Sequence, residues 1–252
     1  MSSGSSSGDS EFSGSGRFVA AINKENSGGK VAVIPDIKLF SPKEGDLLRG
    51  RDPVVMAKLL VRCGAPALSV VTERERFKGS ANLLRHVAYA VDVPVLRKDF
   101  ITEESDLVET VEMGARAVLL ICAVTDRGTI GSLYEKALKL GLEPFVEVCS
   151  EAEMKFASEL GASFIGINNR DISILEKDDG GPSRTVELIS CSPENAVVVS
   201  ESGILSPHDA MLAASAGANA VLVGTALWRA DDIEAMYRSL RVERGSAACA
   251  QS

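Results

Sequence analysis

One pattern of apolar and polar positions repeats along the chain: an amphipathic stretch, a turn of small residues and a short apolar run. In stretches such as residues 54–62 and 106–113, apolar residues recur three to four positions apart, which predicts helices. The turns carry a glycine, a residue that commonly ends a helix. The apolar runs are too short for helices and therefore predict buried strands. Turn and run together span residues 63–71, 113–121, 140–148, 160–168 and 216–224.

Three further apolar runs, at residues 31–37, 93–99 and 196–202, complete a set of eight predicted strands. Strands alternate with helices, which favours parallel strands joined by right-handed crossovers. Eight such units predict an α/β fold, a (β/α)8 TIM barrel formed as a single domain by residues 17–242. A doubly wound open sheet is the alternative, but no Gly-x-Gly-x-x-Gly sequence follows the first strand.

Composition changes this picture mainly at the two ends. Residues 1–16 are nearly all serine and glycine, so we expect a disordered linker or tag there, and a loose C-terminal tail over residues 243–252.

The net charge of −8 argues against a nucleic-acid partner, and no apolar stretch reaches the roughly 18 residues that span a membrane. Five cysteines without paired spacing predict free thiols in a reducing cytoplasm. His86 and His208 have no second ligand at metal spacing, so we expect no metal site.

The polar residues that could carry chemistry stand at the carboxyl ends of the predicted strands, where barrel enzymes place their active sites. They include Asp36 and Lys38 after the first strand, Lys98 after the third, Glu147 after the fifth and Glu201 after the seventh. Residues two apart share one face of a strand, so Asp36 and Lys38 point the same way. We expect these ammonium and carboxylate groups to meet inside the barrel, where neighbouring opposite charges keep each other ionised and burial lowers the pKa of lysine. Such a set suits general acid–base catalysis, and ion pairs that only stabilise the barrel are the alternative.

The last two strands predict a phosphate site. Gly203 follows the seventh strand, and Gly224 and Thr225 follow the eighth, in both cases next to a predicted helix start. Free backbone N–H groups at such positions bind phosphate. Two ordinary turns are the alternative. The chain has no Walker A sequence, so a nucleoside triphosphate is not implied.

Eight motifs occur in order over about residues 30–240: PDIKLFSPKEG, GAPALSVVTERERFKGS, VPVLRKDFI, ARAVLLICA, PFVEV, FIGINNRDI, VVSESGI and AVLVGTALWRADD. Together they resemble the motifs of indole-3-glycerol phosphate synthase, the barrel enzyme of tryptophan biosynthesis. The resemblance implies a carboxy-lyase that closes the ring of 1-(2-carboxyphenylamino)-1-deoxyribulose 5-phosphate with loss of CO₂ and water. It also implies that no metal or organic cofactor is used.

The resemblance further implies roles for individual residues. Lys98 matches the general acid that protonates the substrate carbonyl, Glu147 a general base, and Lys38 a substrate contact that also acts in dehydration. Asp36 would hold or relay protons, and Glu201 is the acidic partner at the seventh strand. The remaining implied contacts are Asn168 and Ser202, which orient the substrate, Arg170 and Ser41 near the anthranilate, Phe77 as an apolar wall, and Gly203, Gly224 and Thr225 at the phosphate.

The chain departs from the family pattern in three places. Asp36, preceded by Pro35, stands where the family has glutamate, and the shorter side chain should draw the carboxylate back by roughly 1–1.5 Å. Phe40 stands where a basic residue is usual, and Lys43 follows instead. The segment 17–30 allows about two turns of helix and is shorter than the extension that helps to cover the barrel mouth in the family.

Other functions stay open on these residues alone. A phosphoribosylanthranilate isomerase-like enzyme would use a Cys/Asp pair, with Cys122 as the candidate thiol, and an aldolase-like enzyme would use a Schiff-base lysine. A catalytically impaired or non-enzymatic barrel is the third option. The expected partner is a small anionic sugar phosphate, with no nucleic acid and no membrane. We expect a cytoplasmic monomer or weak dimer, with association to other tryptophan-pathway enzymes as a further option.

Overall fold

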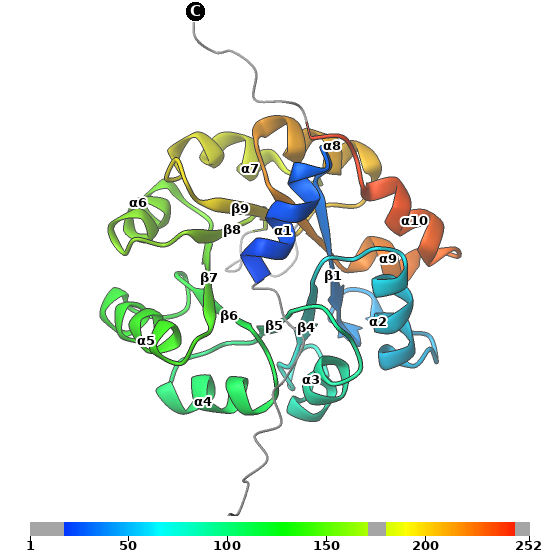
Figure 1. Ribbon diagram of the computed structural model, residues 1–252, viewed down its shortest axis with the longest axis horizontal. Coiled ribbons are helices and arrows are strands. Elements are labelled where there is room, and N and C mark those ends of the chain that lie inside the picture. Colours follow the sequence, from blue (N-terminus) through cyan, green and yellow to red (C-terminus); the bar gives the residue numbers. More distant parts are fainter. Residues whose placement is uncertain (1–17, 171–179, 245–252) are drawn as a thin grey trace, which may run out of the picture.

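The computed structural model describes residues 18–170 and 180–244 and shows a closed barrel of eight parallel strands (Figure 1). The predicted barrel is therefore confirmed, and the open sheet is excluded. The expected linker at residues 1–16 lies outside the described residues, as does most of the expected tail. In order around the barrel the strands are β1 (Ala32–Ile37), β4 (Leu68–Val71), β5 (Val95–Lys98), β6 (Ala117–Ile121), β7 (Glu143–Val148), β8 (Phe164–Asn168), β9 (Val197–Glu201) and β10 (Ala220–Val223).

An outer ring of helices covers the barrel, as Figure 1 shows. The glycine turns predicted to end helices are confirmed, because Gly64, Gly114, Gly141, Gly161 and Gly217 all adopt positive φ at helix ends. The helices are α2 (Pro53–Arg62), α3 (Ala81–Ala88), α4 (Glu104–Glu112), α5 (Arg127–Lys139), α6 (Glu151–Glu159), α7 (Ser183–Leu188), α8 (Pro207–Ala216), α9 (Thr225–Arg229) and α10 (Ile233–Leu240), with a 3-10 turn η1 (Ile189–Cys191).

Alternation along each strand separates an inner from an outer apolar layer. In β1, Ala32 and Ile34 belong to the cluster that fills the barrel interior, whereas Val33 and Ile37 belong to a cluster with the surrounding helices. Because successive side chains point to opposite faces, the polar residue that follows Ile34 by two positions, Asp36, also faces inward. The same rule sends side chains at the carboxyl end of every strand toward a common centre.

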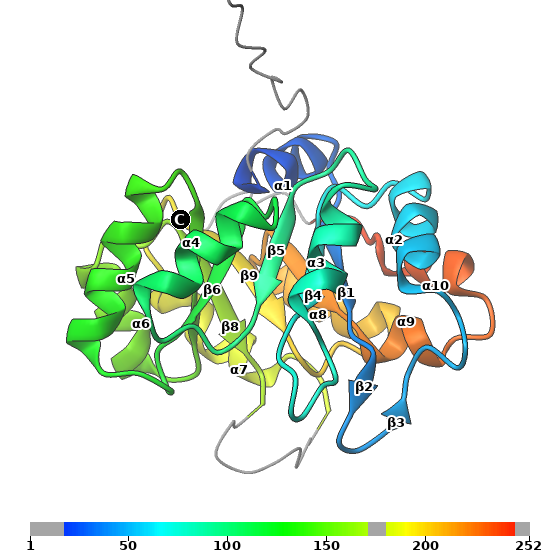
Figure 2. The same cartoon turned by 90° about the horizontal axis from the view of Figure 1, so that it is seen from below.

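A short helix closes the end of the barrel opposite to those carboxyl ends. α1 (Phe18–Ser27) lies at the far end from the hairpin β2–β3 (Phe40–Ser41 and Gly45–Asp46) in Figure 2 and buries Phe18 and Ile22 completely. The carboxylate of Glu143, at the start of β7, accepts hydrogen bonds from the first two N–H groups of α1 at 2.5 and 3.0 Å. The described part of this segment does not cover the mouth, because its apolar side chains complete the inner cluster at the other end.

β1 accommodates Pro35 without losing its place in the barrel. It pairs with β10 over residues 32–35 and with β4 from Asp36 onward. The missing N–H of the proline therefore falls where the pairing with β4 begins, a position at which proline is tolerated.

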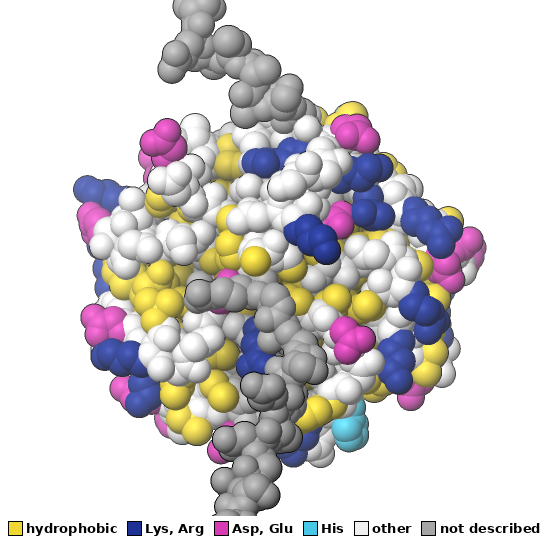
Figure 3. Space-filling model, in the orientation of Figure 1, with side chains coloured by type: hydrophobic (Ala, Val, Ile, Leu, Met, Phe, Trp, Pro, Cys, Tyr) yellow, Lys and Arg dark blue, Asp and Glu magenta, His cyan; other side chains and the backbone are white. Residues whose placement is uncertain are grey.

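Charges of both signs are interspersed on the outer surface. On the face that Figure 3 shows, Lys and Arg side chains lie beside Asp and Glu side chains around the rim. Exposed pairs such as Arg238 with Glu234, 3.0 Å apart, contribute about 0–1 kcal/mol each. None of the described helices has the length and apolar character needed to cross a membrane.

Candidate active site

A cavity of about 200 Å³ lies at the carboxyl ends of the strands. Leu119 and Ile121 of β6 and Leu222 of β10 give it an apolar part, and the charged groups predicted from the sequence stand around them. Ser41 is the one predicted site residue that does not line it, because it is buried within the hairpin while Pro42 takes the place at the cavity. The residues brought together are Asp36, Lys38, Phe77, Lys98, Glu147, Asn168, Arg170, Glu201, Ser202, Gly203, Gly224 and Thr225.

Lys98, the last residue of β5, lies between two buried carboxylates. Its Nζ is 2.6 Å from Oε2 of Glu201 and 3.4 Å from Oε2 of Glu147. The side chain of Lys98 is 21% exposed, whereas those of Glu147 and Glu201 are 3% and 1% exposed. Two buried carboxyl groups therefore hold the ammonium, and one side of it stays open to the cavity.

The three groups alter one another's protonation. Burial works against the ammonium of Lys98, but the charges of Glu201, Glu147 and Asp36 outweigh it and hold the pKa of Lys98 above its ordinary value. Burial thus acts in the expected direction, but the three nearby carboxylates make the net shift of the Lys98 pKa upward. Burial, with the negative charge of Glu147, raises the pKa of Glu201 to about 8. Oε1 of Glu201 has no hydrogen-bond partner among the described residues, which fits a carboxyl that is neutral near pH 7.

Two consecutive asparagines at the end of β8 point to opposite sides. Asn168 faces the cavity and donates a hydrogen bond to Oε1 of Glu147 at 3.0 Å. Asn169 points away and donates to the backbone oxygens of Glu201 at 2.9 Å and Ser202 at 3.0 Å. One amide thus positions the carboxylate and the other positions the neighbouring strand end. Asn169 was not among the predicted site residues, although strand alternation could have assigned it this supporting place.

Asp36 and Lys38 both reach the cavity from the end of β1. Oδ1 of Asp36 accepts a hydrogen bond from the hydroxyl of Ser69 at 2.7 Å. Nζ of Lys38 lies 5.5 Å from the centre of the Phe77 ring, within cation–π range. A Cβ on Gly224 would lie 3.4 Å from Oδ2 of Asp36, so the ends of β1 and β10 are in close contact here.

The predicted phosphate residues stand at the ends of β9 and β10. Gly224 is the N-cap of α9, as expected for a residue at a helix start. α8, however, begins only at Pro207, so the prediction that Gly203 adjoins a helix start is wrong. Gly203 instead has φ +71° and accepts a hydrogen bond from the N–H of Gly181 at 3.1 Å. Ser202 also adopts a positive φ, 64°, which is uncommon for a residue with a side chain.

Among the cavity-lining residues that the sequence did not predict are Arg76, Phe100 and Leu205. All three stand in loops, where alternation along a strand no longer tells which way a side chain points. Arg170 also lies on the rim, and its N–H donates to Oδ1 of Asn168 at 3.0 Å.

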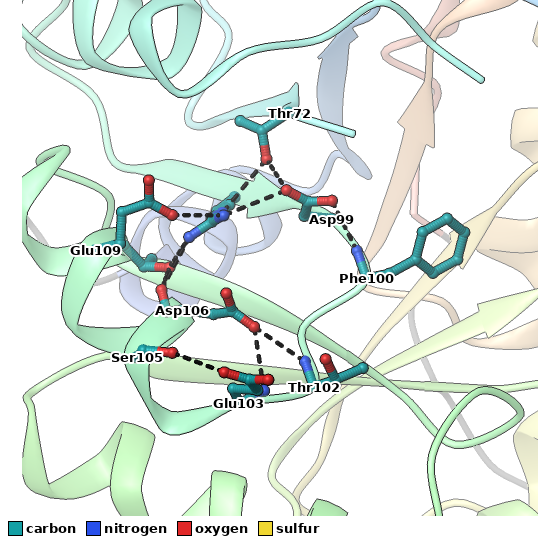
Figure 4. A network of polar contacts seen from close by, with 10 residues as sticks. Thr72, Asp99, Phe100, Thr102, Glu103, Ser105, Asp106 and Glu109 are labelled. Atoms are coloured by element: carbon teal, nitrogen blue, oxygen red, sulfur yellow. Dashed lines mark hydrogen bonds and ion pairs between the residues drawn. The ribbon is translucent and has the colours of Figure 1, made fainter. Parts of the chain in front are cut away.

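Arg97, next to Lys98, points to the outside of the barrel and contacts Asp99, Asp106 and Glu109, which are labelled in Figure 4. Its guanidinium donates to the backbone oxygen of Asp106 in α4 at 2.8 Å. It also lies 3.0 Å from Oε2 of Glu109 and 3.3 Å from Oδ2 of Asp99. Arg97 and Asp99, on either side of Lys98, therefore contact one another, and Arg97 also contacts α4. These contacts hold the backbone of Lys98 in place at the cavity.

The cavity therefore offers proton donors and acceptors on several sides of a small molecule. Lys98 supplies an ammonium, Glu201 a carboxyl with a pKa of about 8, and Glu147 a carboxylate side chain held by an amide. Within residues 18–170 and 180–244, no group of three or more His, Cys, Asp or Glu side chains is arranged to hold a metal ion. The chemistry that the described side chains can supply is proton transfer.

Comparison with known proteins places this geometry in a family. The family profile described as indole-3-glycerol phosphate synthase matches residues 11–240. The protein of that name from Pyrococcus abyssi is 40% identical over 210 residues, which are 83% of this chain and 91% of that protein. The protein of the same name from Pyrococcus furiosus is 43% identical over 203 residues, which are 81% of this chain and 88% of that protein. The protein of that name from Geobacillus kaustophilus is 40% identical over 230 residues, which are 90% of this chain and 87% of that protein. The chain belongs to the indole-3-glycerol phosphate synthase family.

Proposed function

We propose that this protein is an indole-3-glycerol phosphate synthase, a carboxy-lyase of tryptophan biosynthesis. The substrate, 1-(2-carboxyphenylamino)-1-deoxyribulose 5-phosphate, loses CO₂ and water as a new carbon–carbon bond closes its second ring. No step needs an external oxidant or reductant, so the reaction depends on well-placed acids and bases. Family membership and the position of Lys98 between Glu147 and Glu201 support the proposal, and that position is the observation that carries it.

Lys98 is the proposed general acid of ring closure. The ring carbon that bears the carboxylate attacks the ketone carbon, and negative charge develops on the ketone oxygen. Lys98 donates a proton to that oxygen, and CO₂ then leaves, returning its bonding electrons to the ring. The raised pKa of Lys98 keeps the ammonium charged until the substrate oxygen becomes basic enough to take the proton. Glu201, neutral below about pH 8, can return a proton to Lys98.

Dehydration needs a second acid and a base. Lys38 is proposed to protonate the departing hydroxyl while Glu147 takes a proton from the adjacent carbon, so that water leaves and the indole forms. The hydrogen bond from Asn168, at 3.0 Å, keeps Glu147 directed at the cavity. Asp36 is proposed to hold or relay protons beside the two lysines.

The two ends of the substrate require different contacts. The backbone around Gly203, Gly224 and Thr225 is proposed to bind the phosphate through N–H groups, with Ser202 orienting the sugar. Phe77 and Arg170 lie on the rim and are proposed to contact the aromatic ring and its carboxylate.

Two other activities receive less support. An isomerase with a cysteine acid would need a thiol in the cavity, but Cys122 does not line it, and burial raises the pKa of Cys122 to about 12. A Schiff-base aldolase needs a lysine that readily loses its proton, whereas the pKa of Lys98 is raised.

The test is turnover by the purified protein, followed by the fluorescence of the indole product. We expect product from the unaltered protein, and a loss of about 10²-fold or more for Lys98→Met because a general acid contributes this much. Lys139→Met, on the exposed end of α5, is the matched control and should leave the rate unchanged. Folded protein that forms no product would contradict the proposal. Asp36→Asn should slow turnover, and an unchanged rate would remove Asp36 from the proton relay.

We further propose a cytoplasmic enzyme that is a monomer or weak dimer and has no nucleic-acid or membrane partner. Sedimentation velocity over a range of protein concentrations measures the oligomeric state. A tight dimer at micromolar concentration would contradict this part of the proposal.

A further inference from the structure

Cations and aromatic rings are paired around the entrance of the cavity. The Arg76 guanidinium carbon lies 5.5 Å from the centre of the Phe100 ring, and both residues line the cavity. Lys38 stands in the same relation to Phe77, also at 5.5 Å. The entrance thus presents two apolar rings, each with a positive charge beside it. This combination suits a ligand that is both aromatic and anionic.

The loop that carries Arg76 is held in a defined conformation. The carboxylate of Glu73 accepts hydrogen bonds from the N–H groups of residues 75, 76 and 77, at 2.8–2.9 Å. The N–H of Gly79 donates to the backbone oxygen of Glu73 at 2.7 Å. A Cβ on Gly79 would lie 2.8 Å from Cα of Thr72, so the loop needs glycine there. The backbone of Arg76 is therefore positioned before any ligand arrives.

The side chain of Arg76 has donors to offer. In the part of the chain that the structure describes, its guanidinium contacts the Phe100 ring and makes no hydrogen bond or ion pair. The cation deeper in the cavity, Lys98, is already engaged by two carboxylates. A ligand carboxylate near Lys98 therefore competes with two protein carboxyl groups, whereas at the rim the guanidinium of Arg76 has no such competitor within the described part of the chain.

The same loop also supplies positive charge at a place where the chain departs from its family. Phe40 replaces a usual basic residue after β1, and Nζ of Lys78 lies 5.9 Å from the centre of the Phe40 ring. Lys78, in the loop between β4 and α3, thus places a positive charge beside the position where the usual basic residue is missing.

We propose that Arg76 is a specificity-determining residue that, in addition to Arg170, binds the carboxylate of the substrate's aromatic ring, with that ring against Phe77 and Phe100. This inference rests on the proposed function and adds a residue that its proton-transfer steps do not require. A guanidinium is planar and presents paired N–H donors that match a carboxylate. The contact forms in the ground state and ends when CO₂ leaves, so it lowers KM and has little effect on kcat.

The experiment compares Arg76→Met with Arg74→Met. Both changes remove a charge and keep much of the stem, but Arg74 lies beside a neighbouring hollow and not beside the cavity. For each protein, KM and kcat are measured, together with the affinity, by calorimetry, for two inhibitors. These are the ribitol phosphates made by reducing the substrate ketone, one with the ring carboxylate and one without.

For Arg76→Met we expect KM to rise about tenfold and kcat to stay within about twofold. The preference of the unaltered protein for the carboxylated inhibitor should fall by about tenfold, and Arg76→Lys should restore part of it. Arg74→Met should change none of these values by more than about twofold. Equal weakening of both inhibitors, or the same loss in Arg74→Met, would overturn the inference. Failure of the proposed function is a separate result: the unaltered protein would form no product, while the inhibitor pair would still report whether Arg76 recognises the carboxylate.

Discussion

The cluster of Lys98, Glu147 and Glu201 predicts how turnover depends on pH. Burial and the charge of Glu147 raise the pKa of Glu201 to about 8, so this carboxyl is neutral below that pH and ionised above it. When it ionises, a second negative charge beside Lys98 strengthens the hold on the ammonium proton and weakens Lys98 as an acid. We therefore expect kcat to fall as the pH rises through about 8.

The size of the fall follows from the fraction of protein in which Glu201 is neutral. An apparent pKa of about 8 leaves roughly 90% neutral at pH 7 and roughly 10% at pH 9, so kcat should fall about ninefold between these pH values and about tenfold per further pH unit. The pKa of Lys98 lies above its ordinary value, so Lys98 keeps its ammonium charge near pH 8 and does not cause the fall of kcat there. Stability changes with the same sign: the contribution of Glu201 is fully present below its ordinary pKa and is lost as the pH rises through about 8.

The Glu201→Gln variant tests whether ionisation of Glu201 causes the fall of kcat at alkaline pH. Glutamine is neutral at every pH and still offers an oxygen to Lys98, which lies 2.6 Å from Oε2 in the unaltered protein. Initial rates at saturating substrate, followed by product fluorescence from about pH 6 to about pH 10, should show the alkaline limb in the unaltered protein and a flat profile in the variant. A limb that persists unchanged in the variant, or its absence from the unaltered protein, would refute the reasoning.

Four further substitutions test the packing of the barrel. Gly166→Ala places a Cβ 2.6 Å from Oε1 of Glu201 and should lower kcat, and it should lower the free energy of unfolding by about 1–3 kcal/mol. Gly131→Ala, in α5, adds a Cβ with no atom within 4 Å and should raise the free energy of unfolding by about 1 kcal/mol. Urea unfolding measures both changes. Arg97→Met should cost about 2–3 kcal/mol of unfolding free energy, less than for a fully buried pair because its acidic partners are partly exposed; an unchanged urea midpoint would argue against the network. Glu143→Gln should weaken the docking of α1 by about 1 kcal/mol and speed its amide exchange without changing kcat, since α1 lies at the opposite end of the barrel.

The strand ends of the site could be predicted because they follow from local geometry. In β5, Leu96 belongs to the inner cluster, so Lys98 faces inward and Arg97 faces the helices, as two-residue alternation requires. Closure of the barrel then brings residues from different strands to one centre, with no need to know the packing in detail. The same reasoning finds Asp36, Glu147 and Glu201 together.

Other features depend on distant parts of the chain and could not be predicted from local patterns. The pKa of Lys98 is set by three carboxylates from three strands, and their sum exceeds the effect of burial. The amphipathic pattern of α1 indicates that one face is buried but does not tell which end of the barrel it covers. Arg76 and Phe100 stand in loops whose course depends on contacts such as those of Glu73.

Asp36 stands at the end of β1 where the family has glutamate. It keeps the negative charge at this position, but its shorter side chain places the carboxylate farther from the substrate. Oδ1 accepts the hydroxyl of Ser69 at 2.7 Å, and Oδ2 lies beside Gly224, so the carboxylate is held against the wall formed by the neighbouring strand ends. Its charge still contributes to the raised pKa of Lys98. Because Coulomb attraction falls only slowly with distance whereas proton transfer needs direct contact, the loss of one methylene weakens a relay far more than it weakens charge stabilisation. Of the two tasks proposed for Asp36, the geometry therefore favours holding the lysine protonated over carrying a proton to the substrate.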